Sequence, residues 1–169
     1  MGDPEHFKRH YTGLWKKHKD DTLELKNELA TTHPQLMNVM KLGYSVSDEY
    51  KEFSPDEKAE PSITIHKDFH EKCCIWVTGS DKDIPATSDL WIRPDKIAKA
   101  KIKNEVNIKC YFYLKYPKVR YVLELDDVIV HINNIQDVNL KGVREQYVAI
   151  PVSKAKPVDN LHDWIKNNY

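Results

Sequence analysis

Hydrophobic residues recur at helical spacing through the first part of the chain. Five of them are separated by polar residues at intervals close to a 3.6-residue period, namely Phe7, Leu14, Leu25, Leu29 and Leu36. The Thr-His-Pro sequence at residues 32–34 interrupts this pattern, because the residue before a proline avoids the α region. A short further helix is expected from Pro34 to Gly43. The pattern therefore predicts a helical prefix of two or three helices that ends at Gly43.

From Ser62 onward the hydrophobic pattern becomes typical of strands. The predicted strands are rich in β-branched and aromatic residues and cover residues 62–69, 72–79, 106–114, 120–132 and 146–152. A short helix is expected to begin at Pro94, and a C-terminal helix is expected after Asp159 or Asn160 as its N-cap. The predicted fold class is α+β, with the helical prefix followed by a mixed, barrel-like β-sheet and the C-terminal helix.

The segment between the two patterns is acidic and contains Pro55 and Pro61 but few apolar residues, as is typical of a surface loop. We expect three parts in the chain: a helical prefix (residues 1–43), an acidic linker (44–62) and a β-rich domain with its C-terminal helix (63–169).

Composition places the chain among folded proteins. It has 169 residues, of which 40% are hydrophobic and 31% charged. No apolar stretch approaches the roughly 20 residues that span a bilayer, so the sequence predicts an intracellular protein, cytoplasmic or nuclear, with no membrane partner. The odd set of three cysteines does not suggest a disulfide framework.

Charge is segregated along the chain although the net charge is zero. Residues 86–121 contain nine Lys or Arg and three Asp or Glu, which leaves a local net charge of +6. Within this region Lys109, Tyr111, Tyr113 and Lys115 share one face of a predicted strand. If that face is exposed, it forms a basic, aromatic surface able to follow a sugar-phosphate backbone. The predicted nucleic-acid-binding set also includes Arg93, Lys99, Lys101 and Lys103.

Motifs for catalysis are weak. His66 and His70 have the spacing of a helical metal site but lie in a segment that is predicted to be a strand and a turn. Glu124, Asp126 and Asp127 lie at the end of a strand, as nuclease carboxylates often do, but no Glu-x-Lys pair accompanies them on the next strand. The five glycines are too scattered to form a phosphate-binding loop. The sequence therefore nominates no catalytic residue, no metal site and no cofactor.

The order of segments in the second half resembles the small barrels of the PUA-like superfamily, especially the EVE and YTH branch. The resemblance covers about 90 residues, 63–152. It rests on the succession of "CCIWVTGS", "SDLWIRP", a short basic helix, "VNIKCYFYL" and "VRYVLELDDVIVHI". It implies a pocket in which aromatic side chains enclose a nucleobase, with Trp91 and Trp76 as the walls.

The function expected on this basis is recognition of a base or a short single-stranded segment of DNA or RNA, without catalysis. Two alternatives stay open. The chain could be a metal-dependent nuclease or other nucleic-acid-processing enzyme that uses strand carboxylates. It could also be a protein-interaction or accessory protein, for instance a viral one, with no ligand. The sequence makes no prediction of the oligomeric state.

Overall fold

The main feature of the fold is a five-stranded mixed sheet with the strand order β1-β2-β3-β5-β6. The computed structural model describes residues 4–43, 59–84, 88–140 and 143–169, and it confirms the α+β class. β3 and β5 are parallel, whereas the other neighbouring strands are antiparallel. The strands are β1 (Met40–Leu42), β2 (Ile63–Lys67), β3 (His70–Gly79), β5 (Lys109–Lys115) and β6 (Arg120–Glu124).

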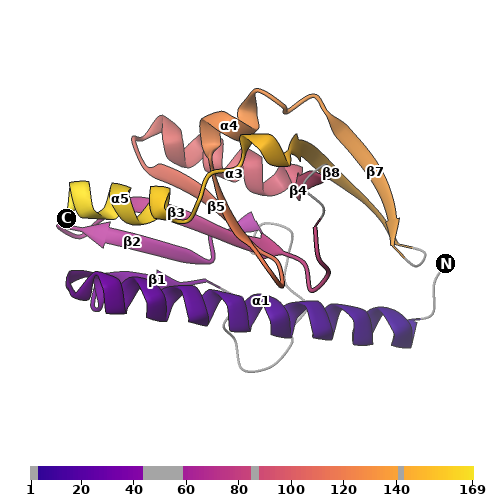
Figure 1. Ribbon diagram of the computed structural model, residues 1–169, viewed down its shortest axis with the longest axis horizontal. Coiled ribbons are helices and arrows are strands. Elements are labelled where there is room, and N and C mark those ends of the chain that lie inside the picture. Colours follow the sequence, from indigo (N-terminus) through magenta and orange to yellow (C-terminus); the bar gives the residue numbers. More distant parts are fainter. Residues whose placement is uncertain (1–3, 44–58, 85–87, 141–142) are drawn as a thin grey trace.

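A second, smaller antiparallel sheet has the order β4-β8-β7. It is formed by β4 (Asp89–Ile92), β8 (Val143–Pro151) and β7 (Ile135–Leu140), and β7 and β8 extend away from the main sheet as a long hairpin (Figure 1). Among the described residues neither sheet closes on itself, so the barrel expected from the sequence is wrong.

Helices cover both faces of the main sheet. α1 (Pro4–Thr32) lies on one side, and α3 (Pro94–Glu105) and α4 (Leu125–Ile129) lie on the other (Figure 1). α5 (Asp159–Asn168) packs on the α1 side, because Leu161 and Ile165 share a buried cluster with Leu25. Short 3-10 helices follow α1 and β8, namely η1 (Pro34–Leu36) and η3 (Val152–Lys154). The small sheet contributes Leu90, Ile92, Val148 and Ile150 to the core on the α3 side.

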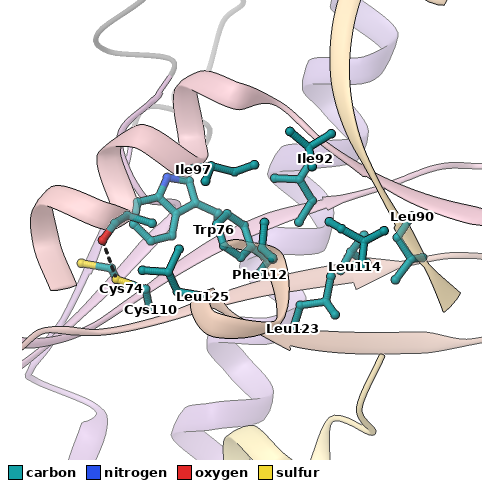
Figure 2. Packing of buried hydrophobic residues seen from close by; sticks show 14 of the residues in the cluster. Cys74, Trp76, Leu90, Ile92, Ile97, Cys110, Phe112, Leu114, Leu123 and Leu125 are labelled. Carbon is teal, nitrogen blue, oxygen red and sulfur yellow. Dashed lines mark hydrogen bonds between the residues drawn. The ribbon is translucent and has the colours of Figure 1, made fainter. Parts of the chain in front are cut away.

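This two-sided covering explains the composition of the central strands. In β3, Cys73, Ile75 and Val77 pack towards α1 and α5, while Cys74 and Trp76 pack towards α3 (Figure 2). Because successive strand side chains alternate between faces, a strand that is buried on both sides is apolar throughout. β3 and β5 are the two parallel neighbours, and both show such a run.

The predicted strand at residues 120–132 is interrupted at Leu125. Glu124 and Asp127 form a capping box, in which the Asp127 carboxylate accepts a hydrogen bond from the Glu124 backbone N–H (2.9 Å). This cap ends β6 and begins α4. Residues 34–43, which were expected to be a helix, form instead η1 and the short edge strand β1. β4 and β7 were not among the predicted strands.

Most of the predicted acidic linker, residues 44–58, lies outside the described residues, and the division into three parts stays a prediction. α1 packs directly on the sheet, since Leu25 and Leu29 share a buried cluster with residues of β2, β3 and β5. None of the described helices is long and apolar enough to cross a membrane.

Candidate functional site

Trp76, one of the two predicted base-binding tryptophans, is a core residue. Its side chain has no exposed surface, stacks on Phe112 (ring centroids 5.5 Å apart) and donates a hydrogen bond from Nε1 to the Ala59 carbonyl oxygen (2.8 Å). Figure 2 shows the indole enclosed by α3 and the central strands. The structure therefore corrects the expectation that Trp76 forms the wall of an open pocket.

Trp91, in contrast, is exposed. Its side chain retains 40% of its surface and stacks on Tyr147 of β8, with the ring centroids 5.6 Å apart. Tyr111 and Tyr113 do share one face of β5, but α1 and α5 cover that face, and both residues are buried. The prediction that Tyr111 and Tyr113 are exposed is therefore wrong. The role of Trp91 in binding stays a prediction.

The predicted basic residues are mostly engaged in ion pairs with acids, most of which belong to other segments of the chain. The partners are Glu60 for Lys99, Glu71 for Lys103, Glu124 for Lys109, Glu24 and Asp21 for Lys115, and Asp95 for Arg93. Only Lys101 of this set has no ion pair among the described residues, and it is exposed. The local excess of positive charge is thus neutralised within the molecule and does not form a continuous phosphate-binding surface.

The carboxylates that follow β6 also have structural partners. Glu124 pairs with Lys109 and Lys156, and Asp127 pairs with Lys156 and caps α4. These contacts hold the pKa of the Glu124 carboxyl below its usual range, although burial acts in the opposite direction. Across the described parts of the chain, no three His, Cys, Asp or Glu side chains converge as a metal site. Glu124 and Asp127 are thus engaged in structural contacts, whereas Asp126 is exposed.

A cleft of about 440 Å³ lies instead where α1 crosses the ends of β3 and β5. Ser80 and Asp81 come directly after β3, Tyr116 and Pro117 come directly after β5, and α1 supplies the opposite wall. The lining residues are Lys16, Lys17, Asp20, Asp21, Ser80, Asp81, Lys115, Tyr116 and Pro117. Because β3 and β5 are parallel, the cleft lies at the carboxyl ends of both strands, where open α/β sheets usually bind ligands.

Charge inside the cleft is organised around Asp21, which is 7% exposed. Its carboxylate pairs with Lys17 one helical turn earlier and lies 3.7 Å from Nζ of Lys115. Lys115 also donates to Glu24, and although burial opposes the charged form, these contacts raise the pKa of the Lys115 ammonium. Asp20 and Asp81 are exposed to the cleft opening. The three lysines of the cleft are each paired with a carboxylate, Lys16 with the exposed Asp20 (3.5 Å), whereas Asp81 has no ion pair among the described residues. An anionic group could exchange with these exposed pairs at the cleft opening.

A second polar group lies next to the cleft, beneath α1. His18 and the Ser62 hydroxyl share a hydrogen bond (3.0 Å), and Ser62 Oγ accepts another from the Val77 backbone N–H (3.0 Å). Burial, together with the charges of Lys96 and Lys17, lowers the pKa of His18 to about 3. Burial also lowers the pKa of the Lys96 ammonium to about 8. His18 is therefore a neutral hydrogen-bonding group at pH 7, in which form it anchors α1 to the beginning of β2.

This anchor predicts a specific sensitivity to acid. The pKa of His18 is lower in the folded state than its usual 6.5, so the unfolded chain binds more protons between pH 6.5 and about 3. Stability is complete above pH 6.5 and should fall as the pH is lowered through this window. Thermal melts of the parent and of His18→Gln between pH 7.5 and 4 should show a shallower decline for the variant. An equal slope in the two proteins would contradict the assignment.

The sequence signals for the cleft are modest. Lys16 with Asp20 and Lys17 with Asp21 have the i, i+4 spacing of helical ion pairs, and polar residues follow the ends of two strands. What could not be read from the sequence is that these two strands are parallel neighbours and that α1 crosses their ends.

No protein-family model and no curated protein matches this chain. Among solved structures, the chain is similar to a nuclease from a fusselovirus, with 19% identity, a TM-score of 0.50, and coverage of 88% of this chain and 87% of the other. A Holliday junction resolvase from the archaeal hyperthermophile Archaeoglobus fulgidus matches with 11% identity and a TM-score of 0.47, over 86% of this chain and 94% of the other.

The similarity to the fusselovirus nuclease is a similarity of fold. It shows that the resemblance to PUA-like barrels, inferred from the sequence, is wrong. The described residues of this chain form an open mixed sheet with helices on both faces and no PUA-like or EVE-like barrel, and the match covers 88% of the chain. The expectation of a base-recognition protein without catalysis depended on that barrel and is corrected with it. In fold, this chain is similar to a nuclease.

Proposed function

We propose that the chain is a nucleic-acid-processing enzyme of the nuclease class that holds a phosphodiester group in the cleft between α1 and the ends of β3 and β5. The observation that carries this proposal is the composition of the cleft, in which Lys16, Lys17 and Lys115 face Asp20, Asp21 and Asp81. Lysines bind phosphate oxygens, and carboxylates activate water or hold a divalent cation. The fold of a viral nuclease supports the same reaction class.

The residues of the cleft have distinct roles in this proposal. Lys115 and Lys17 are positioned by Asp21, which is buried between them and acts as a positioning residue. Asp20 and Asp81 are the exposed carboxylates that would contact the reacting phosphate or its attacking water. Trp91, Arg93 and Lys101, the accessible members of the predicted binding set, are proposed to contact the strand outside the cleft.

A divalent cation is compatible with this donor set. Mg²⁺ is commonly bound through one or two carboxylates, with water and substrate phosphates as its other ligands. Asp20 and Asp81 provide two carboxylates at the cleft, and no third described side chain completes a protein-only site. When bound, such an ion would polarise the phosphoryl oxygen and lower the pKa of a bound water.

The proposal is tested by cleavage of labelled single-stranded, duplex and four-way branched DNA, and of RNA, with Mg²⁺, with Mn²⁺ and with a chelator. We expect cleavage of at least one of these substrates in the presence of a metal. The double variant Asp20→Asn/Asp81→Asn should lose about 100-fold or more of the rate, because it keeps the shape of the cleft and removes the charge of both exposed carboxylates.

Asp137→Asn is the matched control, since Asp137 is an exposed aspartate that pairs with Arg144 on the β7–β8 hairpin. It should cleave at the parent rate. The proposal fails if the parent cleaves none of the substrates, or if the double variant is as active as the control.

A further inference from the structure

The turn between β2 and β3 holds an aromatic side chain entirely in solvent. Phe69 is 101% exposed, and it stands at the tip of the hairpin formed by two antiparallel strands. Asp68 and Phe69 have φ values of 52° and 66°, which places two consecutive non-glycine residues in the left-handed region. Aspartate is found there fairly often, but for a bulky side chain such as phenylalanine this conformation is a genuine outlier.

Stability alone does not favour phenylalanine at this position. Two-residue hairpin turns with positive φ strongly prefer Asn-Gly or Asp-Gly, because glycine adopts the second position without steric cost. Phe69 therefore carries both a conformational cost and the cost of an apolar ring in water. Backbone strain of this kind persists where the surrounding structure enforces it, and it is concentrated at binding and catalytic positions.

The hairpin is held firmly in place by the C-terminal helix. Nζ of Lys67 donates to the Asn168 carbonyl oxygen (2.8 Å) and lies 5.3 Å from the ring centroid of Tyr169. The Tyr169 hydroxyl donates to the His66 carbonyl oxygen (3.1 Å). Phe69 thus projects from a supported turn, and its exposure is built into the packing of this end of the molecule.

Two exposed lysines beside the turn could approach an anionic partner. Lys67, His70 and Lys72 are exposed close to Phe69 in the sequence. The acid that follows, Glu71, is neutralised by Lys103 (2.8 Å) on α3. Asp68 is therefore the only carboxylate of residues 66–72 without an ion pair within the described structure. An exposed ring flanked by two lysines has the composition of a nucleic-acid contact, in which the ring stacks on a base and the lysines approach phosphates.

We propose that residues 66–72, the Phe69 finger, form a second contact with the nucleic acid, in which the Phe69 ring stacks on or between bases. The proposal rests on the proposed function for the nature of the partner. Phe69 directly precedes β3, and the cleft residues Ser80 and Asp81 directly follow β3, so the 10 residues of β3 separate the Phe69 ring from the cleft. A strand of that length spans about 33 Å, which corresponds to about one turn of duplex DNA.

Phe69→Gly distinguishes a binding role from a structural one, because the substitution should raise the stability of the fold while it lowers the affinity for DNA. Glycine removes the strain of the turn, so the melting temperature should rise by about 2–4 °C. The affinity for labelled single-stranded and duplex DNA, measured by fluorescence anisotropy with a chelator present, should fall about 5- to 100-fold. Phe69→Trp should keep the parent affinity. Ile102→Ala, which removes an exposed apolar side chain from α3, should also leave affinity unchanged.

The outcomes distinguish this proposal from the proposed function. If Phe69→Gly binds DNA as tightly as the parent while the parent cleaves its substrate, the finger is overturned and the enzyme assignment is kept. If the substitution weakens binding to vesicles of anionic phospholipid but leaves the affinity for DNA unchanged, the finger is likewise overturned. If the parent binds DNA in a Phe69-dependent manner but cleaves nothing, the finger is supported and the proposed function fails.

Discussion

Trp76→Ala is expected to lower the free energy of unfolding by about 3–5 kcal/mol, which is a large part of the stability of a typical domain. The indole is fully buried, and it is the largest of the fully buried side chains. Its removal leaves a cavity between β3 and α3 and abolishes the stacking contact with Phe112. It also leaves the Ala59 carbonyl oxygen without its hydrogen bond, so the segment before β2 loses one of its links to the core.

Urea denaturation followed by far-UV circular dichroism measures this loss. Trp91→Ala is the matched control, because the same ring is removed from a position that is 40% exposed. The control should lose markedly less stability than Trp76→Ala. Equal losses in the two variants would show that burial does not distinguish the two tryptophans and would contradict the core assignment of Trp76.

Gly79→Ala is expected to cost about 3 kcal/mol or more and to distort the cleft at the same time. Gly79 has a φ of 127°, and an added Cβ would lie 2.0 Å from the backbone oxygen of Lys115. Neither the strained dihedral nor the overlap with backbone atoms can be relieved by a side-chain rotation. The ends of β3 and β5 would have to separate, which would break the hydrogen bond from the Ser80 backbone N–H to the Lys115 carbonyl oxygen (3.1 Å).

The effect of this substitution should appear in thermal unfolding and in cleavage together. Ser80→Ala is the control at the next position, since it removes only a hydroxyl group from the wall of the cleft. It should melt within a few degrees of the parent. A Gly79→Ala protein with the parent melting temperature would mean that the two strand ends can move apart at little cost, and the close approach would then have no structural importance.

Local sequence patterns were sufficient for the fold class and for several individual elements. The apolar and β-branched runs of β2, β3 and β5 identified them as strands, because burial on both faces leaves a continuous signal. The break at Leu125 was missed because a capping box of acidic residues resembles a polar strand end. The division into two sheets was missed for a different reason, since it depends on which strands pair across long distances in the chain.

The candidate site was less predictable, because its decisive contacts are not local. Lys115 was predicted to be part of an exposed basic surface, but its partner is Glu24, which precedes it by 91 residues, and the nearby Arg120 likewise pairs with Glu28, 92 residues earlier. Tyr113 was placed correctly on the face with Lys115, yet nothing in its neighbours along the chain indicates that α1 covers it. Side-chain direction could be inferred from strand alternation, whereas exposure required knowledge of the helix packing.

The ion pairs between α1 and the β5–β6 hairpin also affect how the protein meets its substrate. Each pair is a short dipole, whose field decays much faster with distance than that of a single charge. The chain, with zero net charge, therefore has little long-range attraction for a polyanion, and electrostatic steering should add little to its association rate. We expect it to encounter nucleic acid at the rate of an unsteered docking reaction, about 10⁵–10⁶ M⁻¹s⁻¹, so substrate selection would depend on how long each encounter lasts.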